Sequence, residues 1–93
     1  MDAMNMGDAL KRFINESPYK HQMQAAQIES AWEKIMGKTI ANYTDKIQII
    51  GDKLIISTQV APLKQELNMQ SEKILKRVNE ELGREVVKVL LIQ

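Results

Sequence analysis

The residue types that perform catalysis are few and widely separated in this chain of 93 residues. His21 is the only histidine, and no acidic residue lies at a spacing that would complete a catalytic triad with it. Asp45 and Asp52 flank a predicted strand, so two carboxylates sharing one cleft are not indicated. The absence of cysteine excludes thiolate nucleophiles, disulfide bonds and thiolate metal sites, and a single histidine leaves no usual metal-ligand set. We therefore expect a protein that is not an enzyme and has no cofactor, with His21 as a surface residue near the start of a helix.

Positive charge is the second feature that could carry function. The formal net charge is only +1, from 13 basic and 12 acidic residues, so the overall charge does not favour nucleic acid. The middle third of the chain is nevertheless locally positive. Its candidate nucleic-acid-binding residues are Lys34, Lys38, Lys46, Lys53 and Lys64. Phosphate contact needs only positive charge on an ordered surface; the alternative is an ordinary solvated surface.

A second basic cluster consists of Lys73, Lys76 and Arg77, on one flank of a predicted helix. It is interpreted as a solvated face supported by the Glu72 to Lys76 pair at i, i+4. Phosphate contact is again the alternative.

Three large side chains are candidates for packing or for partner contacts. Trp32 is expected in the core, because Ile28 and Ile35 flank it at helical spacing; an exposed binding anchor is the alternative. Met69 lies on the polar side of its predicted helix, so it either packs on a helix at the N-terminus or belongs to a partner site. Tyr43 is the second candidate partner-binding residue.

These side chains must be positioned by a small set of helices and strands. The longest apolar stripe runs from Pro62 to Gly83 and predicts one helix roughly 31 Å long, with a proline in its first turn and a glycine stop. The residues of the stripe are Leu63, Leu67, Ile74, Val78 and Leu82, and Ser71 interrupts it.

The remaining elements follow from periodicity and from turn residues. We expect frayed residues at 1–5, a helix from 6 to 17, a helix from 19 or 20 to 36 capped by Gly37, and a short helical turn at 40–43. Residues 47–60 predict a hairpin that turns at Gly51-Asp52, and residues 85–92 a strand. In that strand Val87, Val89 and Leu91 are expected to face the helices.

The order of elements is α-α-β-β-α-β, which predicts one α+β domain over residues 1–93. Its simplest packing is a three-stranded sheet with the helices on one face, the last strand lying parallel to the second if the long helix crosses over between them. The longest aliphatic run, at residues 89–92, is too short to span a bilayer. Residues 1–12 lack the apolar region of an export signal, so a cytoplasmic protein is expected.

A series of short motifs resembles one known family. Residues 31–41, AWEKIMGKTIA, are similar to the family pattern W-x-x-(I/V)-(V/M)-G-x-x-(I/L)-A. The motifs that follow are Tyr-Thr at 43–44, L-x-(I/V)-x-(V/T) at 54–58, L-x-x-E-L at 63–67 and (I/L)-x-x-x-(L/V)-N-x-x-(L/V)-G at 74–83. Together they cover about residues 7 to 92, and in this order they resemble the DciA-like proteins, a family long known only as a domain of unknown function.

The resemblance implies a small domain similar to the K-homology fold. It further implies a bacterial protein that helps to load or operate the replicative helicase and that contacts both this helicase and DNA. K-homology RNA readers clamp the nucleic-acid backbone with a G-x-x-G loop. This chain contains no such loop, so RNA binding does not follow from the resemblance.

Three functions are therefore compared. The first is a non-catalytic adaptor of helicase loading, with a protein partner and weak, sequence-independent DNA binding. The second is a general protein-interaction or self-associating module of another pathway, which fits the near-neutral charge and Met69. The third is a weak RNA or single-strand binder, for which only Tyr19 and Tyr43 offer stacking aromatic rings.

Overall fold

The computed structural model describes residues 18–93. In chain order the elements are α2 (Lys20–Met36), α3 (Lys38–Asn42), β1 (Lys46–Ile50), β2 (Lys53–Ser57), α4 (Ala61–Met69), α5 (Ser71–Leu82) and β3 (Val89–Ile92). The α+β class and the predicted order are confirmed from the second helix onward. The predicted helix at 6–17 and the frayed residues 1–5 lie outside the described residues.

The three strands form one mixed sheet in the order β1-β2-β3. β1 and β2 are antiparallel and are joined by Gly51-Asp52, where Gly51 takes the positive φ of 62° that a two-residue hairpin turn demands. β2 and β3 are parallel, as a crossover between them predicts. The sheet therefore places the hairpin and the last strand side by side, with β2 in the centre.

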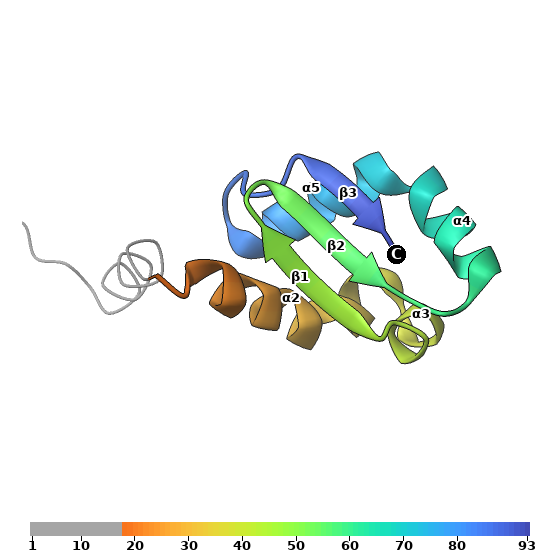
Figure 1. Cartoon of the computed structure of the whole chain (residues 1–93). Coiled ribbons are helices and arrows are strands. Elements are labelled where there is room, and N and C mark those ends of the chain that lie inside the picture. Colours follow the sequence, from red (N-terminus) through yellow and green to blue (C-terminus); the bar gives the residue numbers. More distant parts are fainter. Residues whose placement is uncertain (1–17) are drawn as a thin grey trace, which may run out of the picture.

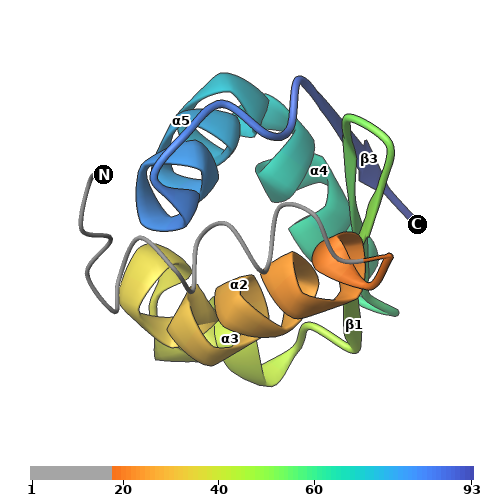
Figure 2. The ribbon, with the colours of Figure 1, turned by 90° about the vertical axis from the view of Figure 1, so that its left-hand side faces the viewer.

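All the helices of the described residues lie on one side of this sheet. Figure 1 looks onto the sheet, with α2 and α5 behind it, and Figure 2 shows the same layers from the side. α2 packs against β1 and α5, while α4 packs against β3. The predicted arrangement of helices on one face is confirmed, and the opposite face of the sheet has no helix of residues 18–93 on it.

The core between the helices and the sheet is aliphatic around one tryptophan. Its buried members are Ala25, Ile28, Trp32 and Ile35 of α2, Ile47 and Ile49 of β1, Leu54 and Ile56 of β2, Leu67 of α4, Ile74 and Val78 of α5, and Val87. Trp32 is only 2% exposed, which confirms its core assignment. No helix among residues 18–93 is long and apolar enough to cross a bilayer.

The predicted single helix from Pro62 to Gly83 is wrong in one respect, because it breaks at Gln70. There the backbone leaves helical geometry (φ −102°, ψ 16°), and the Gln70 N–H donates to the carbonyl of Leu67 over 3.1 Å, three residues back. The Gln70 side chain also donates to the Glu66 carboxylate over 2.6 Å. Because of the break, α4 packs against β3 while α5 packs against α2. One straight helix would not reach both neighbours.

The predicted orientation of β3 is also wrong. Val87 is buried as expected, but Val89 and Leu91 are 39% and 43% exposed, and Leu90 and Ile92 pack on the core instead. The cause is an irregular hydrogen-bond pattern at the start of the strand. The N–H groups of Lys88 and Val89 both donate to the carbonyl of Asp52, over 2.7 and 3.2 Å. Two consecutive residues thus share one partner, which shifts the alternation by one residue.

Candidate functional site

The structure places the five candidate nucleic-acid-binding lysines on five different elements. Lys34 lies in α2, Lys38 begins α3, Lys46 begins β1, Lys53 begins β2 and Lys64 lies in α4. Four of them are exposed, and Lys64 is half-buried. Only Lys46 and Lys53 project from the same face of the sheet, because they alternate with the buried residues of their strands.

Lys34 has a partner of its own. Its ammonium lies 3.2 Å from the carboxylate of Glu81 on α5, and its side chain is 77% exposed. An exposed pair of this kind adds little stability, but it lowers the positive charge that Lys34 offers to a phosphate.

The second basic cluster divides into two parts. Arg77 donates from Nη1 to the carbonyl of Ile35 over 2.8 Å, so its guanidinium caps the C-terminal turn of α2, where a cation is favoured. Lys73 and Lys76 are exposed on α5. Arg77 therefore has a structural role, whereas Lys73 and Lys76 fit the interpretation as a solvated face.

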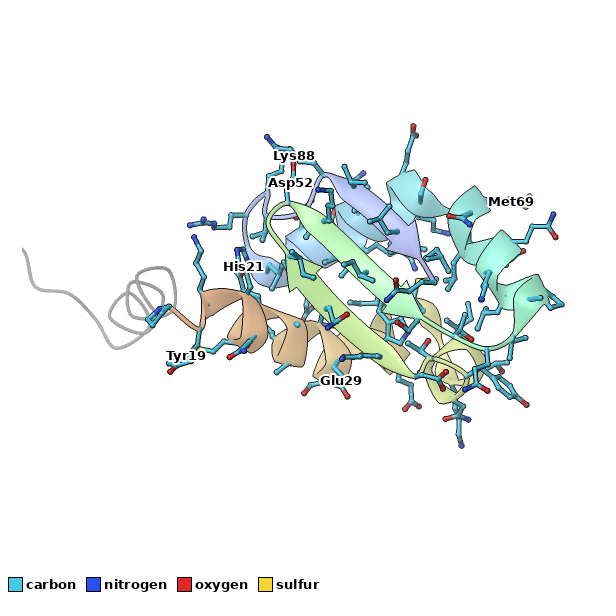
Figure 3. The ribbon with its side chains drawn as sticks, in the orientation of Figure 1. Tyr19, His21, Glu29, Asp52, Met69 and Lys88 are labelled. Atoms are coloured by element: carbon cyan, nitrogen blue, oxygen red, sulfur yellow. The ribbon has the colours of Figure 1, made fainter. Side chains whose placement is uncertain are left out.

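The two candidate partner-binding residues are both exposed and lie at different places in the fold. Tyr43 is 56% exposed directly after α3, and Met69 is 78% exposed at the end of α4, beside the helix break. Figure 3 shows the Met69 side chain pointing away from the ribbon. Packing within residues 18–93 therefore does not explain a methionine at position 69. This agrees with its place on the polar side of the predicted helix.

Several residues of the family motifs hold the fold together. The Trp32 indole N–H donates to the Thr44 hydroxyl over 2.9 Å, and this hydroxyl donates to the carbonyl of Ile40 over 2.7 Å. The buried Thr58 hydroxyl in turn donates to the carbonyl of Tyr43 over 2.6 Å. These bonds tie α2, α3 and the β2–α4 connection together, so the motif around Trp32 is explained by structure and does not require a binding role.

Asn79, another residue of the family motifs, also holds backbone segments together through its side chain. Its side-chain oxygen accepts from the N–H groups of Val86 and Val87 over 2.8 and 3.0 Å, and its amide donates to the carbonyl of Val87 over 2.9 Å. One α5 side chain therefore fixes the extended segment that leads into β3.

His21 differs from its predicted place on the surface. It is half-buried, and within the described part of the chain its Nδ1 is buried without a hydrogen-bond partner. It lines a hollow of about 390 Å³ between α2 and β1, together with residues that include Ala25, Glu29, Lys46 and Ile47. Figure 3 places His21 in the first turn of α2 and Glu29 further along the same helix.

Sequence reasoning missed one surface, which we call the open sheet face. It comprises the side chains that alternate with the core residues of the strands: Lys46, Gln48, Ile50, Lys53, Ile55, Ser57, Val89 and Leu91. Ile55 belongs to this face, since it is buried and yet is not a member of the core cluster. The apolar run at residues 54–56 indicates this surface, because three consecutive apolar residues of a strand place at least one apolar side chain on each face of the sheet.

Among residues 18–93, no group of three or more His, Cys, Asp or Glu side chains is arranged to hold a metal ion. The candidate contact surfaces of the described residues are the exposed lysines, the side chains of Tyr43 and Met69, and the open sheet face. They lie on a small α+β domain.

The family follows from comparison with known proteins. The model of the family described as "Dna[CI] antecedent, DciA" matches residues 5–92, so the chain belongs to the DciA family and the predicted resemblance is confirmed. The family is one of replicative-helicase loaders, which supports an adaptor role in DNA replication. A comparison with curated proteins finds no match.

Proposed function

We propose that this chain is a non-catalytic adaptor that binds the replicative helicase of its bacterium and helps to place it on DNA, in the cytoplasm. The observation that carries the proposal is the family match, which extends over residues 5–92. The whole chain, residues 1–93, acts as one domain in this proposal. The exposed side chains of Tyr43 and Met69 are candidate contacts for the partner.

Weak, sequence-independent DNA binding is the second part of the proposal. It is supported by the exposure of Lys38, Lys46 and Lys53. Because the lysines are spread over several elements and Lys34 is paired with Glu81, we expect the DNA affinity of the isolated chain to be low.

The test is binding of the purified chain to the purified helicase hexamer, followed by sedimentation and by loading of the helicase onto a single-stranded circle. We expect a complex at tens of micromolar or below, equivalent to roughly −6 kcal/mol or better, and faster loading in its presence. A strictly monomeric chain that forms no complex at these concentrations contradicts the proposal. Self-association without helicase binding would favour the interaction module of another pathway.

A further inference from the structure

The open sheet face is an apolar and basic surface that no helix of residues 18–93 covers, and we infer that it docks an amphipathic helix with acidic side chains on the replicative helicase. This inference rests on the proposed function, because it takes the helicase as the protein that carries the helix. Beyond the proposed function, it names the surface of this chain that binds the helicase and the chemistry of the helicase segment that is bound.

The apolar part of the face lies in two rows that cross the sheet. The pairing register places Gln48, Ile55 and Leu91 in one row. The adjacent row consists of Ile50, Lys53 and Val89. Ile50, Val89 and Leu91 are 57%, 39% and 43% exposed and are half of the six large exposed apolar residues within 18–93. Three such side chains on one face, around a nearly buried Ile55, form a patch rather than scattered exposure.

The charge of this face has one sign. Its only ionisable side chains are Lys46 and Lys53, and the acidic residues next to them in the sequence, Asp45 and Asp52, lie just outside the strands. Lys53 lies in register between Ile50 and Val89, so its aliphatic stem adds to the apolar patch while its ammonium stays in water. A partner that covers the patch must therefore bring apolar side chains together with carboxylates.

A helix fits this surface better than other shapes. Neighbouring strands lie about 4.8 Å apart, so the outer two strands of a three-stranded sheet are about 10 Å apart. This spacing matches the roughly 10 Å diameter of an α-helix. One helix laid on the face would cover both rows, with its apolar stripe on Ile55 and Leu91 and its acidic flank toward Lys53.

Two other occupants fit the face less well. Single-stranded nucleic acid binds to sheets through aromatic platforms, and none of the eight residues of this face is aromatic. A second copy of the same face would bring Lys46 and Lys53 of both chains together, which like-charge repulsion opposes.

Photo-crosslinking identifies the occupant directly. The photoreactive residue p-benzoylphenylalanine is placed at position 91 of the full chain, the helicase and a single-stranded oligonucleotide are added, and the products are read by mass spectrometry. We expect crosslinks to a helicase segment that is helical and carries acidic residues beside an apolar stripe. Crosslinks to residues 1–17 of the same chain, to a second copy or to the oligonucleotide would overturn the inference.

Binding by variants measures the same contact. We expect Leu91→Ser and Lys53→Glu each to weaken helicase binding by about tenfold, through lost apolar contact and through charge reversal. Lys76→Glu is the matched control, because it reverses an exposed lysine on α5 and leaves the sheet untouched. Circular dichroism and thermal melting confirm that each variant is folded before it is compared.

The outcomes separate the inference from the proposed function. If the unchanged chain fails to bind the helicase, the proposed function fails. If it binds and the two open-face variants bind equally well, the proposed function stands and the inference is wrong. Met69→Ser distinguishes the surfaces further: a loss in this variant alone would move the docking site to the end of α4.

Discussion

The indole N–H of Trp32 and the hydroxyl of Thr44 lie 2.9 Å apart and join the centre of α2 to the residue that precedes β1 by two positions. The hydroxyl in turn donates a hydrogen bond to the carbonyl of Ile40 over 2.7 Å. Replacing Thr44 by valine keeps the shape and removes both bonds. The part-buried indole N–H of Trp32 is then left without its acceptor, while the carbonyl of Ile40 still accepts from the Tyr43 N–H over 3.2 Å. We expect Thr44→Val to lower the free energy of unfolding by about 1–3 kcal/mol, measured by urea denaturation.

Thr44→Ser is the control for that substitution, because it keeps the hydroxyl and loses only a methyl group. The expected order of stability is unchanged chain, then serine, then valine. Equal stability of the serine and valine variants would show that the hydrogen bonds of Thr44 contribute nothing measurable.

The burial of Trp32 makes a second prediction. Because the side chain is 2% exposed, its fluorescence should be that of an apolar environment in the native state and should shift to the red on unfolding. Trp32→Ala should cost on the order of 3–5 kcal/mol, enough to threaten the folding of so small a domain. A native emission that is already red and scarcely moves in urea would contradict the core position.

Asn79 supplies the third prediction. Its three hydrogen bonds to the backbone of Val86 and Val87 are made by one side chain, so Asn79→Ala should lower the free energy of unfolding by roughly 2–4 kcal/mol. Hydrogen exchange should show the loss first at the amides of residues 86 and 87. Asn68→Ala, on an exposed position of α4, is the matched control and should change stability by less than about 0.5 kcal/mol.

Two glycines with positive φ should respond differently to substitution. Gly37 has φ 89° and ψ 164°, a region almost closed to other residues, whereas Gly83 has φ 81° and ψ 4°, the left-handed helical region. A Cβ at either position meets no atom within 4 Å, so the cost is backbone strain alone. We expect Gly37→Ala to cost about 1–3 kcal/mol and Gly83→Ala about 1 kcal/mol.

Asparagine provides the check on this interpretation. It tolerates the left-handed helical region, so Gly83→Asn should be close to neutral, while Gly37→Asn should remain destabilising. Thermal melting of the four variants measures the order. Equal effects at the two glycines would mean that the backbone geometry at Gly37 does not limit stability.

The sequence predicted the elements well where its pattern was local. The hairpin turn at Gly51-Asp52, the caps at Gly37 and Gly83 and the burial of Trp32 all depend on residues close in the chain, and all are found. The two errors arose where distant contacts decide. The break at Gln70 serves packing on two different neighbours, and its only trace in the sequence was Ser71 within the apolar stripe.

Distant contacts also decide which residues of β3 face the core. Val87, Val89 and Leu91 form a regular alternation in the sequence, but the carbonyl of Asp52, more than thirty residues away, accepts from two successive amides and shifts the phase. Periodicity within the strand does not contain this information. The error concealed the open sheet face, because Val89 and Leu91 were assigned to the core.

The last prediction concerns DNA and is quantitative. If the exposed lysines contact phosphates, binding to single-stranded DNA should be weak, independent of sequence and steeply dependent on salt, because each neutralised phosphate releases counterions. Each contact adds about −0.7 to the log–log slope for single strands, so three or four contacts give a slope between about −2 and −3. Reversing both Lys46 and Lys53 to glutamate should then flatten the slope by at least about 1.4.

The control for this measurement is reversal of Lys73 and Lys76, which are exposed on α5 and which we interpret as a solvated face. Arg77 is left unchanged, because its bond to the carbonyl of Ile35 makes its replacement a structural change. Lys34→Glu should matter less than Lys38→Glu, since Lys34 already faces the carboxylate of Glu81. Fluorescence anisotropy of a labelled oligonucleotide over a range of salt concentrations gives each slope. An affinity that is insensitive to salt, or that survives reversal of both pairs, would show that the chain does not bind phosphates, and the adaptor role would then rest on contact with the helicase alone.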